Sequence, residues 1–215
     1  MTRKLFWEDP YLTEIDTHIT AMNDNEVTVA ETIFYAFAGG QERDHGTISG
    51  HEVLDAHKDG TEIVYSLIDG FGLKVGDAVK MTIDWERRYQ LMRLHFAAEI
   101  VLEFATQNLT GITKIGAHIA QDKARIDFKW KENIADAFPL LTEKANALID
   151  ANHRIVSAFE DVENERRYWE IDGFARVACG GTHLKTTGEI GTVTLHRKNI
   201  GKNKERIEIY VGEQG

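Results

Sequence analysis

The segment Ala178-Cys179-Gly180-Gly181-Thr182-His183 contains the only cysteine of the chain, and a histidine follows it four positions later. Thiolate and imidazole are both zinc ligands, and a tight backbone turn between them would let both reach one ion. Glycine takes positive φ without a steric penalty, so Gly180 and Gly181 suit such a turn. The same spacing also fits a buried cysteine in a core strand beside a surface loop.

A second pair of possible ligands lies in a run with helical periodicity. His95 and Glu99 are four residues apart, so on a helix they share one face and could reach the same ion. The alternative is an ordinary polar pair on a solvated helix face. If the first interpretation holds, a helix and a loop together supply the ligands His95, Glu99, Cys179 and His183 for one zinc ion per chain.

The composition is that of a globular chain. Its 215 residues are 42% hydrophobic and 28% charged, enough for one large or two small domains with real cores. No apolar run approaches the roughly 20 residues of a membrane helix, and the first residues lack the apolar core of a secretion signal. A single cysteine allows no intrachain disulfide, which fits a cytoplasmic location. We therefore expect a cytoplasmic protein with no membrane partner.

The pattern of short alternating segments and turns predicts a mixed α+β chain with two domains. Residues 1–85 carry strand candidates at 27–29, 32–35, 52–54, 62–65 and 78–83, which predict a small antiparallel β-barrel, with residues 9–16 irregular or an added edge. Residues 86–215 are expected to form an α/β domain in which helices pack on an antiparallel sheet. Its candidates are a helix at 85–107, strands at 112–119 and 124–130, a helix opened by Pro139, and a closing strand pair at 191–197 and 205–211.

Taken together, these motifs resemble the AlaX proteins, free-standing relatives of the editing domain of alanyl-tRNA synthetase. The match rests on Cys179 to His183, on Thr187-Gly188-Glu189-Ile190-Gly191, and on Ala38-Gly39-Gly40-Gln41, which is similar to a Gly-Gly-Gly-Gln motif with its first glycine replaced. It runs over roughly residues 5 to 211. In the family the helix carries His-x3-His, whereas this chain has Glu99 at the second position.

The resemblance implies a zinc-dependent deacylase that removes serine, and in some members glycine, from mischarged tRNA(Ala). Residues 86–215 would then be the metal-binding editing domain. The loop Gly39-Gly40-Gln41, carried by the first domain, would close over the aminoacyl end of the tRNA. Thr182, Gln41 and the metal itself are candidates for recognising the serine hydroxyl. The net charge of −10 argues against DNA or any nucleic acid bound by bulk charge. A local patch for the tRNA is nominated at Arg197, Lys198, Lys202 and Lys204, although solvated turn residues look the same in sequence.

Three interpretations of Glu99 remain open. As a fourth ligand, its carboxylate would bring the zinc site near neutrality and make the ion a weaker Lewis acid. As a general base, it would leave three ligands and an open position for water. As the sign of a weakened metal site, it would mark a protein that binds the tRNA or an aminoacyl ester without hydrolysing it. Separately, Cys179 could be a covalent nucleophile rather than a ligand. The oligomeric state is not indicated by the sequence.

Overall fold

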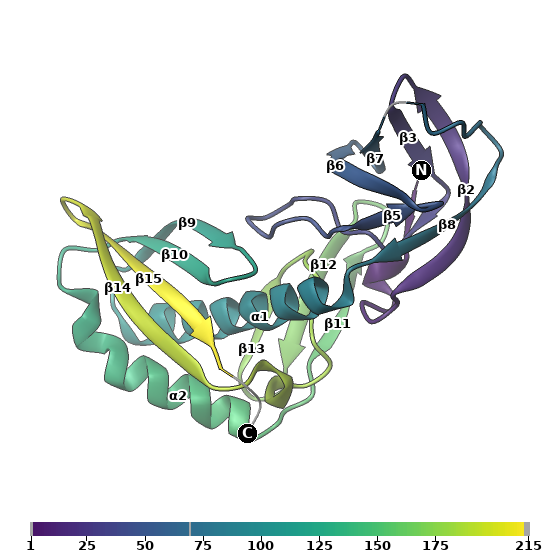
Figure 1. Cartoon of the computed structure of the whole chain (residues 1–215). Helices are drawn as coiled ribbons and strands as arrows, with labels where there is room; N and C mark the ends of the chain where they lie inside the picture. Colours follow the sequence, from purple (N-terminus) through teal and green to yellow (C-terminus); the bar gives the residue numbers. More distant parts are fainter. Residues whose placement is uncertain (1, 69, 213–215) are drawn as a thin grey trace. The chain divides into compact units, whose positions relative to one another are not determined.

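The computed structural model describes residues 2–68 and 70–212, so residues 1, 69 and 213–215 of the two expected domains lie outside it. Contacts divide the chain into two compact units, Met1–Ala38 with Glu42–Tyr89, and Gly39–Gln41 with Gln90–Gly215. The division falls within the long helix α1 (Trp85–Asn108) (Figure 1), whereas the sequence placed it near residue 85. The loop Gly39–Gln41 was expected to belong with the first unit. It belongs with the second, because Gln41 pairs with Ile119 there.

Strands dominate the first unit. They are β1 (Arg3–Lys4), β2 (Glu14–Asn23), β3 (Glu26–Val29), β4 (Glu31–Thr32), β5 (Gly46–Ile48), β6 (His51–Asp59), β7 (Glu62–Leu67) and β8 (Ala78–Ile83), with the short helix η1 (Leu5–Trp7) after β1. Six of them pair in antiparallel fashion in the order β2-β3-β7-β6-β5-β8, and β8 pairs again with β2. The short strands β1 and β4 pair with each other in parallel.

The long strand β2 departs from the sequence expectation, which made residues 9–16 irregular or an edge. It runs from Glu14 to Asn23 and pairs with both β3 and β8. In β2 only Thr17 and Ile19 are buried, so the apolar alternation that signals a strand is weak. In β7, by contrast, Ile63, Tyr65 and Leu67 are all buried, and this strand was correctly predicted.

The second unit is built around α1. It continues through β9 (Thr113–Ile119), β10 (Ala124–Lys129), η2 (Ile134–Ala137), α2 (Phe138–Asp150), β11 (Val156–Asp161), β12 (Arg166–Ile171), β13 (Ala175–Ala178), η3 (Thr187–Ile190), β14 (Val193–Gly201) and β15 (Lys204–Val211). One antiparallel sheet has the order β14-β15-β10-β9, and a second has the order β11-β12-β13. This arrangement confirms a mixed α+β chain with antiparallel sheets and few helices.

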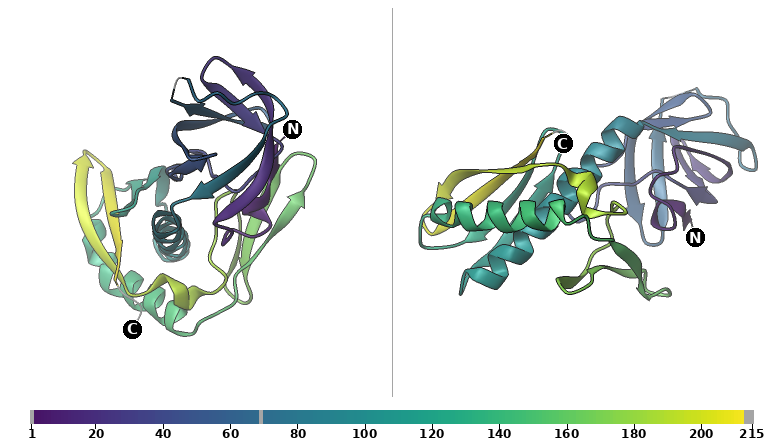
Figure 2. Two further views of the ribbon diagram at one scale, coloured as in Figure 1. Left: turned by 45° about the vertical axis from the view of Figure 1, so that its right-hand side comes forward. Right: turned by 90° about the horizontal axis from the view of Figure 1, so that it is seen from below.

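Helix α1 is buried nearly all round within this unit. Figure 2 (left) shows it close to end-on, with β14 and β15 to one side and the β11–β13 sheet to the other. Its apolar residues Leu91, Phe96, Ala97, Ile100 and Val101 are fully buried, although they point in different directions around the helix. A polar residue on the inner turns of α1 therefore faces protein rather than solvent. No helix among the described residues is long and apolar enough to span a membrane.

A buried ion pair holds the start of α1 in the first unit. The side chains of Arg88 and Asp44 are both 0% exposed; Arg88 Nε donates to Asp44 Oδ1 over 2.8 Å, and Nη2 donates to Oδ2. Arg88 also donates to the backbone carbonyls of Pro10 and Ile33, and the backbone N–H of Tyr35 donates to Asp44. The pair thereby fixes the segment that follows the Gly39–Gln41 loop.

We expect Asp44→Ala to destabilise the protein by about 3–5 kcal/mol, because it leaves the Arg88 guanidinium buried without its counter-charge. The measurement is chemical denaturation followed by far-UV circular dichroism. The matched control is Glu14→Ala, which breaks the pair between Glu14 and Lys80, whose side chains are 61% and 50% exposed. That change should cost about 1 kcal/mol or less. Equal effects of the two variants would contradict the prediction.

Candidate metal centre

Three ligand-type side chains converge inside the second unit. His95 comes from α1, and Cys179 and His183 come from the loop after β13; their nearest ligand atoms all lie within 4.8 Å of one another. Cys179 Sγ is 3.5 Å from His95 Nε2 and 3.3 Å from His183 Nε2. Tetrahedral zinc, with Zn–S about 2.3 Å and Zn–N about 2.0–2.1 Å, places such donor atoms about 3.3–3.6 Å apart. The donor set and its spacing fit a zinc ion.

Glu99 lies at the edge of this group. Its Oε1 is 3.5 Å from His95 Nε2 and 4.0 Å from Cys179 Sγ. Its other oxygen, Oε2, accepts a hydrogen bond from Trp169 Nε1 over 3.0 Å. One carboxylate oxygen is therefore held by β12, and the other is turned toward His95 and Cys179. Both the ligand role and the base role predicted for Glu99 are compatible with this position.

The charges of these groups depend on one another. Burial alone would raise the pKa of Cys179, but the charges of His95 and His183 and their hydrogen bonds lower it to about 6. Burial alone would lower the pKa of His95, but the charge of Cys179 and hydrogen bonds to Cys179 and Glu99 raise it to about 10. Burial alone would raise the pKa of Glu99, but its hydrogen bond to His95 and the charge of His95 lower it to about 2. Without a metal, Cys179 and Glu99 are thus anionic and His95 is cationic at neutral pH, so a metal ion that binds here must displace a proton from His95.

The backbone conformation of the turn between Cys179 and His183 differs from the prediction. Positive φ was expected at Gly180 and Gly181, but neither belongs to the positive-φ glycines. A Cβ at Gly181 would lie 2.1 Å from His95 Cε1 and 2.7 Å from His95 Nδ1. Glycine is required at 181 because the imidazole ring packs directly on its backbone, whereas a Cβ at Gly180 would meet nothing within 4 Å.

Two further residues support the centre and were missed in the sequence. Ser157 Oγ, on β11, lies 2.8 Å from His183 Nδ1, and Trp169, on β12, is the fully buried donor to Glu99. Each contact joins residues 26 or more positions apart in the chain. No local pattern marks a serine or a tryptophan in a strand as a partner of a distant ligand.

The run Thr187–Gly191 supports the loop rather than the ligand atoms. Thr186 and Glu189 form a capping box at η3, and Glu189 Oε1 accepts from the backbone N–H groups of Lys185 and Thr186. Thr187 Oγ1 donates to the carbonyl of Leu148 in α2 over 2.9 Å. These bonds tie the chain after His183 to α2.

The loop Gly39–Gln41 meets the centre at Thr182. Gly40 has φ +89°, and a Cβ there would lie 2.6 Å from the carbonyl oxygen of Ala117, so the backbone requires glycine. Ile119 N–H donates to Gly40 O over 2.8 Å, which holds the loop against β9. Gln41 Nε2 then donates to Thr182 Oγ1 over 3.0 Å, and both side chains are buried. Two of the predicted site residues are thereby brought together.

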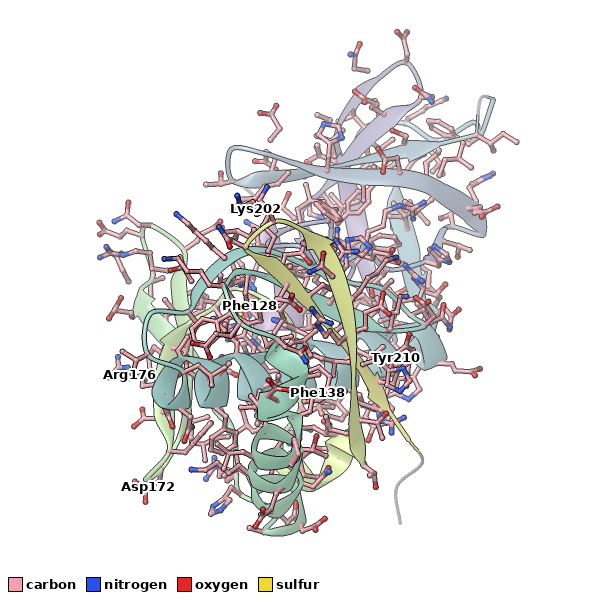
Figure 3. All side chains as sticks on the ribbon, turned by 90° about the vertical axis from the view of Figure 1, so that its left-hand side faces the viewer. Phe128, Phe138, Asp172, Arg176, Lys202 and Tyr210 are labelled. Carbon is pink, nitrogen blue, oxygen red and sulfur yellow. The ribbon has the colours of Figure 1, made fainter. Side chains whose placement is uncertain are left out.

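The nominated basic patch lies on the β14–β15 hairpin. Arg197 donates twice to Glu205, over 2.5 and 2.7 Å, so a carboxylate offsets its charge. Lys198, Lys202 and Lys204 are exposed, and Lys202 lies at the turn (Figure 3). Among the described residues, no hydrogen bond or ion pair joins these lysines to the ligand cluster. Asp127, on the neighbouring strand β10, accepts hydrogen bonds from Arg206 and Arg125.

Replacing Gly181 by Ala is expected to push the His95 ring away and to weaken binding of added Zn²⁺ at least about tenfold, the loss typical of a disturbed metal environment. The measurement is competition with a chromophoric chelator. Gly180→Ala is the matched control, because its new methyl group enters open space. Similar zinc affinity in the two variants would contradict the packing argument.

Known proteins resemble this chain along its length. Residues 167–208 match the family described as the threonyl and alanyl tRNA synthetase second additional domain. The alanyl-tRNA editing protein AlaX-M of Pyrococcus horikoshii is 36% identical over 216 aligned residues, covering 98% of each chain. AlaX-M of Methanosarcina acetivorans is 31% identical, covering 96% of this chain and 98% of that protein.

The alanine–tRNA ligase of Ignicoccus hospitalis is also 36% identical, over 98% of this chain but only 26% of the ligase. The similarity to the ligase therefore concerns one segment of that longer enzyme. With the two free-standing proteins the match runs from end to end, so the chain belongs to the AlaX family of alanyl-tRNA editing proteins.

Proposed function

We propose that this protein is a zinc-dependent deacylase that removes serine or glycine from mischarged tRNA(Ala). The observation that carries the proposal is the convergence of His95, Cys179 and His183 in a chain that matches editing proteins over its whole length. The position of Glu99 beside this group supports its inclusion as fourth ligand. When bound, zinc would polarise the ester carbonyl or lower the pKa of a water molecule.

The chain's own residues have distinct parts in this proposal. Cys179, as thiolate, and the Nε2 atoms of His95 and His183 would hold the ion. Ser157 orients the ring of His183 through Nδ1. Trp169 holds one oxygen of Glu99 and thereby directs the other toward the centre. Cys179 as covalent nucleophile is the alternative, because an imidazole beside a thiolate also activates it, but a nucleophile needs only one such base and the sulfur has two imidazole nitrogens within 3.5 Å.

Selection of serine over alanine requires a polar group that recognises the extra hydroxyl. An apolar pocket discriminates poorly between ligands with and without a hydroxyl. Thr182 fits this part. Its Oγ1 accepts from Gln41, which leaves its own hydroxyl proton to be donated elsewhere. Gly39 and Gly40 supply a loop whose backbone can approach the aminoacyl end closely.

Glu99→Gln and Glu99→Ala separate the two active roles of the carboxylate. If Glu99 is a ligand, Glu99→Ala should lower the zinc content of protein prepared without chelator and abolish deacylation of Ser-tRNA(Ala). If Glu99 is only a base, Glu99→Gln should retain zinc and lose about 10²–10⁴-fold in rate. Elemental analysis and release of labelled serine are the measurements. Glu103→Ala, one turn further along α1, is the matched control.

Two results would overturn the proposal itself. Wild-type protein without zinc after preparation in zinc-supplemented medium would remove the metal centre. Wild-type protein that binds Ser-tRNA(Ala), yet releases no serine at high enzyme concentration, would establish the alternative of a binding protein with a weakened site.

The exposed lysines of the hairpin give a separate prediction for the tRNA. Changing Lys198, Lys202 and Lys204 together to Gln should weaken tRNA binding and flatten its dependence on salt. Each phosphate that the protein no longer neutralises should reduce the slope of log K against log[salt] by about 0.7–0.9. Filter binding at several salt concentrations measures this. Lys58→Gln, on β6 of the first unit, is a single-lysine control, and an unchanged slope in the triple variant would place the tRNA elsewhere.

A further inference from the structure

The two histidines of the metal centre differ in their second ring nitrogen. Nδ1 of His183 lies 2.8 Å from Ser157 Oγ. His95 Nδ1 is buried and has no hydrogen-bond partner among the described residues. A histidine that binds a metal through one nitrogen ordinarily donates the N–H of the other to an acceptor, which fixes its tautomer and orientation. His95 Nδ1 therefore lacks the hydrogen-bond acceptor that a metal-bound histidine ordinarily has.

The orientation of His95 determines which kind of group must fill this place. Its Nε2 faces Cys179 Sγ and Glu99 Oε1, each at 3.5 Å. If Nε2 gives its lone pair to a metal, the neutral ring carries its hydrogen on Nδ1. The missing partner must then be an acceptor, and a donor would not serve.

A buried acceptor without a partner lies beside the same backbone. Gln41 Oε1 is one of the few buried polar atoms that no described residue satisfies, although Gln41 Nε2 donates to Thr182. A Cβ at Gly181 would be 2.7 Å from His95 Nδ1 and 3.0 Å from Gln41 Oε1. The orphan donor and the orphan acceptor thus flank one point next to Gly181.

We propose that Gln41 is the positioning residue of His95: its Oε1 accepts the Nδ1–H when the metal fixes the tautomer. This inference rests on the metal centre of the proposed function, and it gives Gln41 a role beyond contact with substrate. Thr182 Oγ1 can donate or accept, so it does not by itself determine which way the Gln41 amide points. The need for an acceptor at His95 determines this orientation: Oε1 must lie on the side of His95 and Nε2 on the side of Thr182. The amide has this orientation in the structure.

The consequence is a continuous chain of contacts from the loop to the ion. The loop is held on β9 by the bond between Ile119 N–H and Gly40 O. From there Gln41 Nε2 donates to Thr182, and in this proposal Gln41 Oε1 accepts from His95 once the metal is bound. A shift of the loop when the aminoacyl end binds would therefore change the position of the His95 ring, a proposed metal ligand.

The test measures zinc affinity by competition with a chromophoric chelator, independently of deacylation. Gln41→Leu removes the acceptor and should weaken zinc binding about 10- to 100-fold. Gln41→Glu keeps an acceptor of the same reach and should restore most of the affinity. Ser157→Ala, which removes the observed partner of His183, is the positive control, and Gln107→Leu, on the exposed end of α1, is the control for the same chemical change. Circular dichroism establishes that each variant is folded.

A second measurement does not depend on a variant that folds. In zinc-loaded wild-type protein, ¹⁵N-edited NMR should show an imidazole N–H at His95 Nδ1 that exchanges slowly with water. Zinc affinity of Gln41→Leu equal to that of wild type, or a His95 proton in fast exchange, would overturn the inference. Wild-type protein that binds zinc tightly but does not deacylate would instead refute the proposed function and leave this inference intact.

Discussion

The contact between the His95 ring and the backbone of Gly181 is the constraint on which the candidate metal centre depends. His95 is carried by a helix that is buried on nearly every side, so its ring cannot move far without disturbing the core. The loop with Cys179 and His183 must therefore approach the helix, and it can do so only where position 181 lacks a Cβ. This approach brings Cys179 Sγ to 3.5 Å from His95 Nε2. Of the two glycines of the motif, only Gly181 lies against the ring, so the structure requires glycine at 181 but not at 180.

The remaining parts hold the two sides of this contact in place. On one side the capping box at η3 and the bond from Thr187 to Leu148 fasten the loop to α2. On the other, Trp169 of β12 packs edge-on against Phe96 of α1 and donates to Glu99. The loop Gly39–Gln41 completes the arrangement through Thr182. Residues from five separate segments thus support one group of ligands.

Sequence reasoning reached the candidate ligand residues because their signals are local. The spacing from Cys179 to His183 and the helical spacing from His95 to Glu99 are both visible within five residues, and the structure brings His95, Cys179 and His183 together with Glu99 beside them. It could not reach Ser157 and Trp169, whose positions depend on strand pairing in the β11–β13 sheet. It also assigned the Gly39–Gln41 loop to the first unit by its place in the chain, whereas its contacts with β9 place it in the second. The strand β2 was missed because its mostly exposed side chains give little alternation.

The carboxylate of Glu99 changes the electrostatics of the centre, and β12 provides two compensating groups. A thiolate and a carboxylate together neutralise a divalent cation, whereas three histidines and one thiolate would leave about one positive charge and a stronger Lewis acid. Trp169 donates a hydrogen bond to Glu99 and so draws negative charge away from the oxygen that faces the centre. Two positions earlier on the same strand, the buried guanidinium of Arg167 interacts with the charge of Cys179, whose backbone N–H donates to Arg167 O. One strand thus supplies a hydrogen-bond donor for the carboxylate and a positive charge for the thiolate, which offsets part of the negative charge that Glu99 adds to the candidate centre.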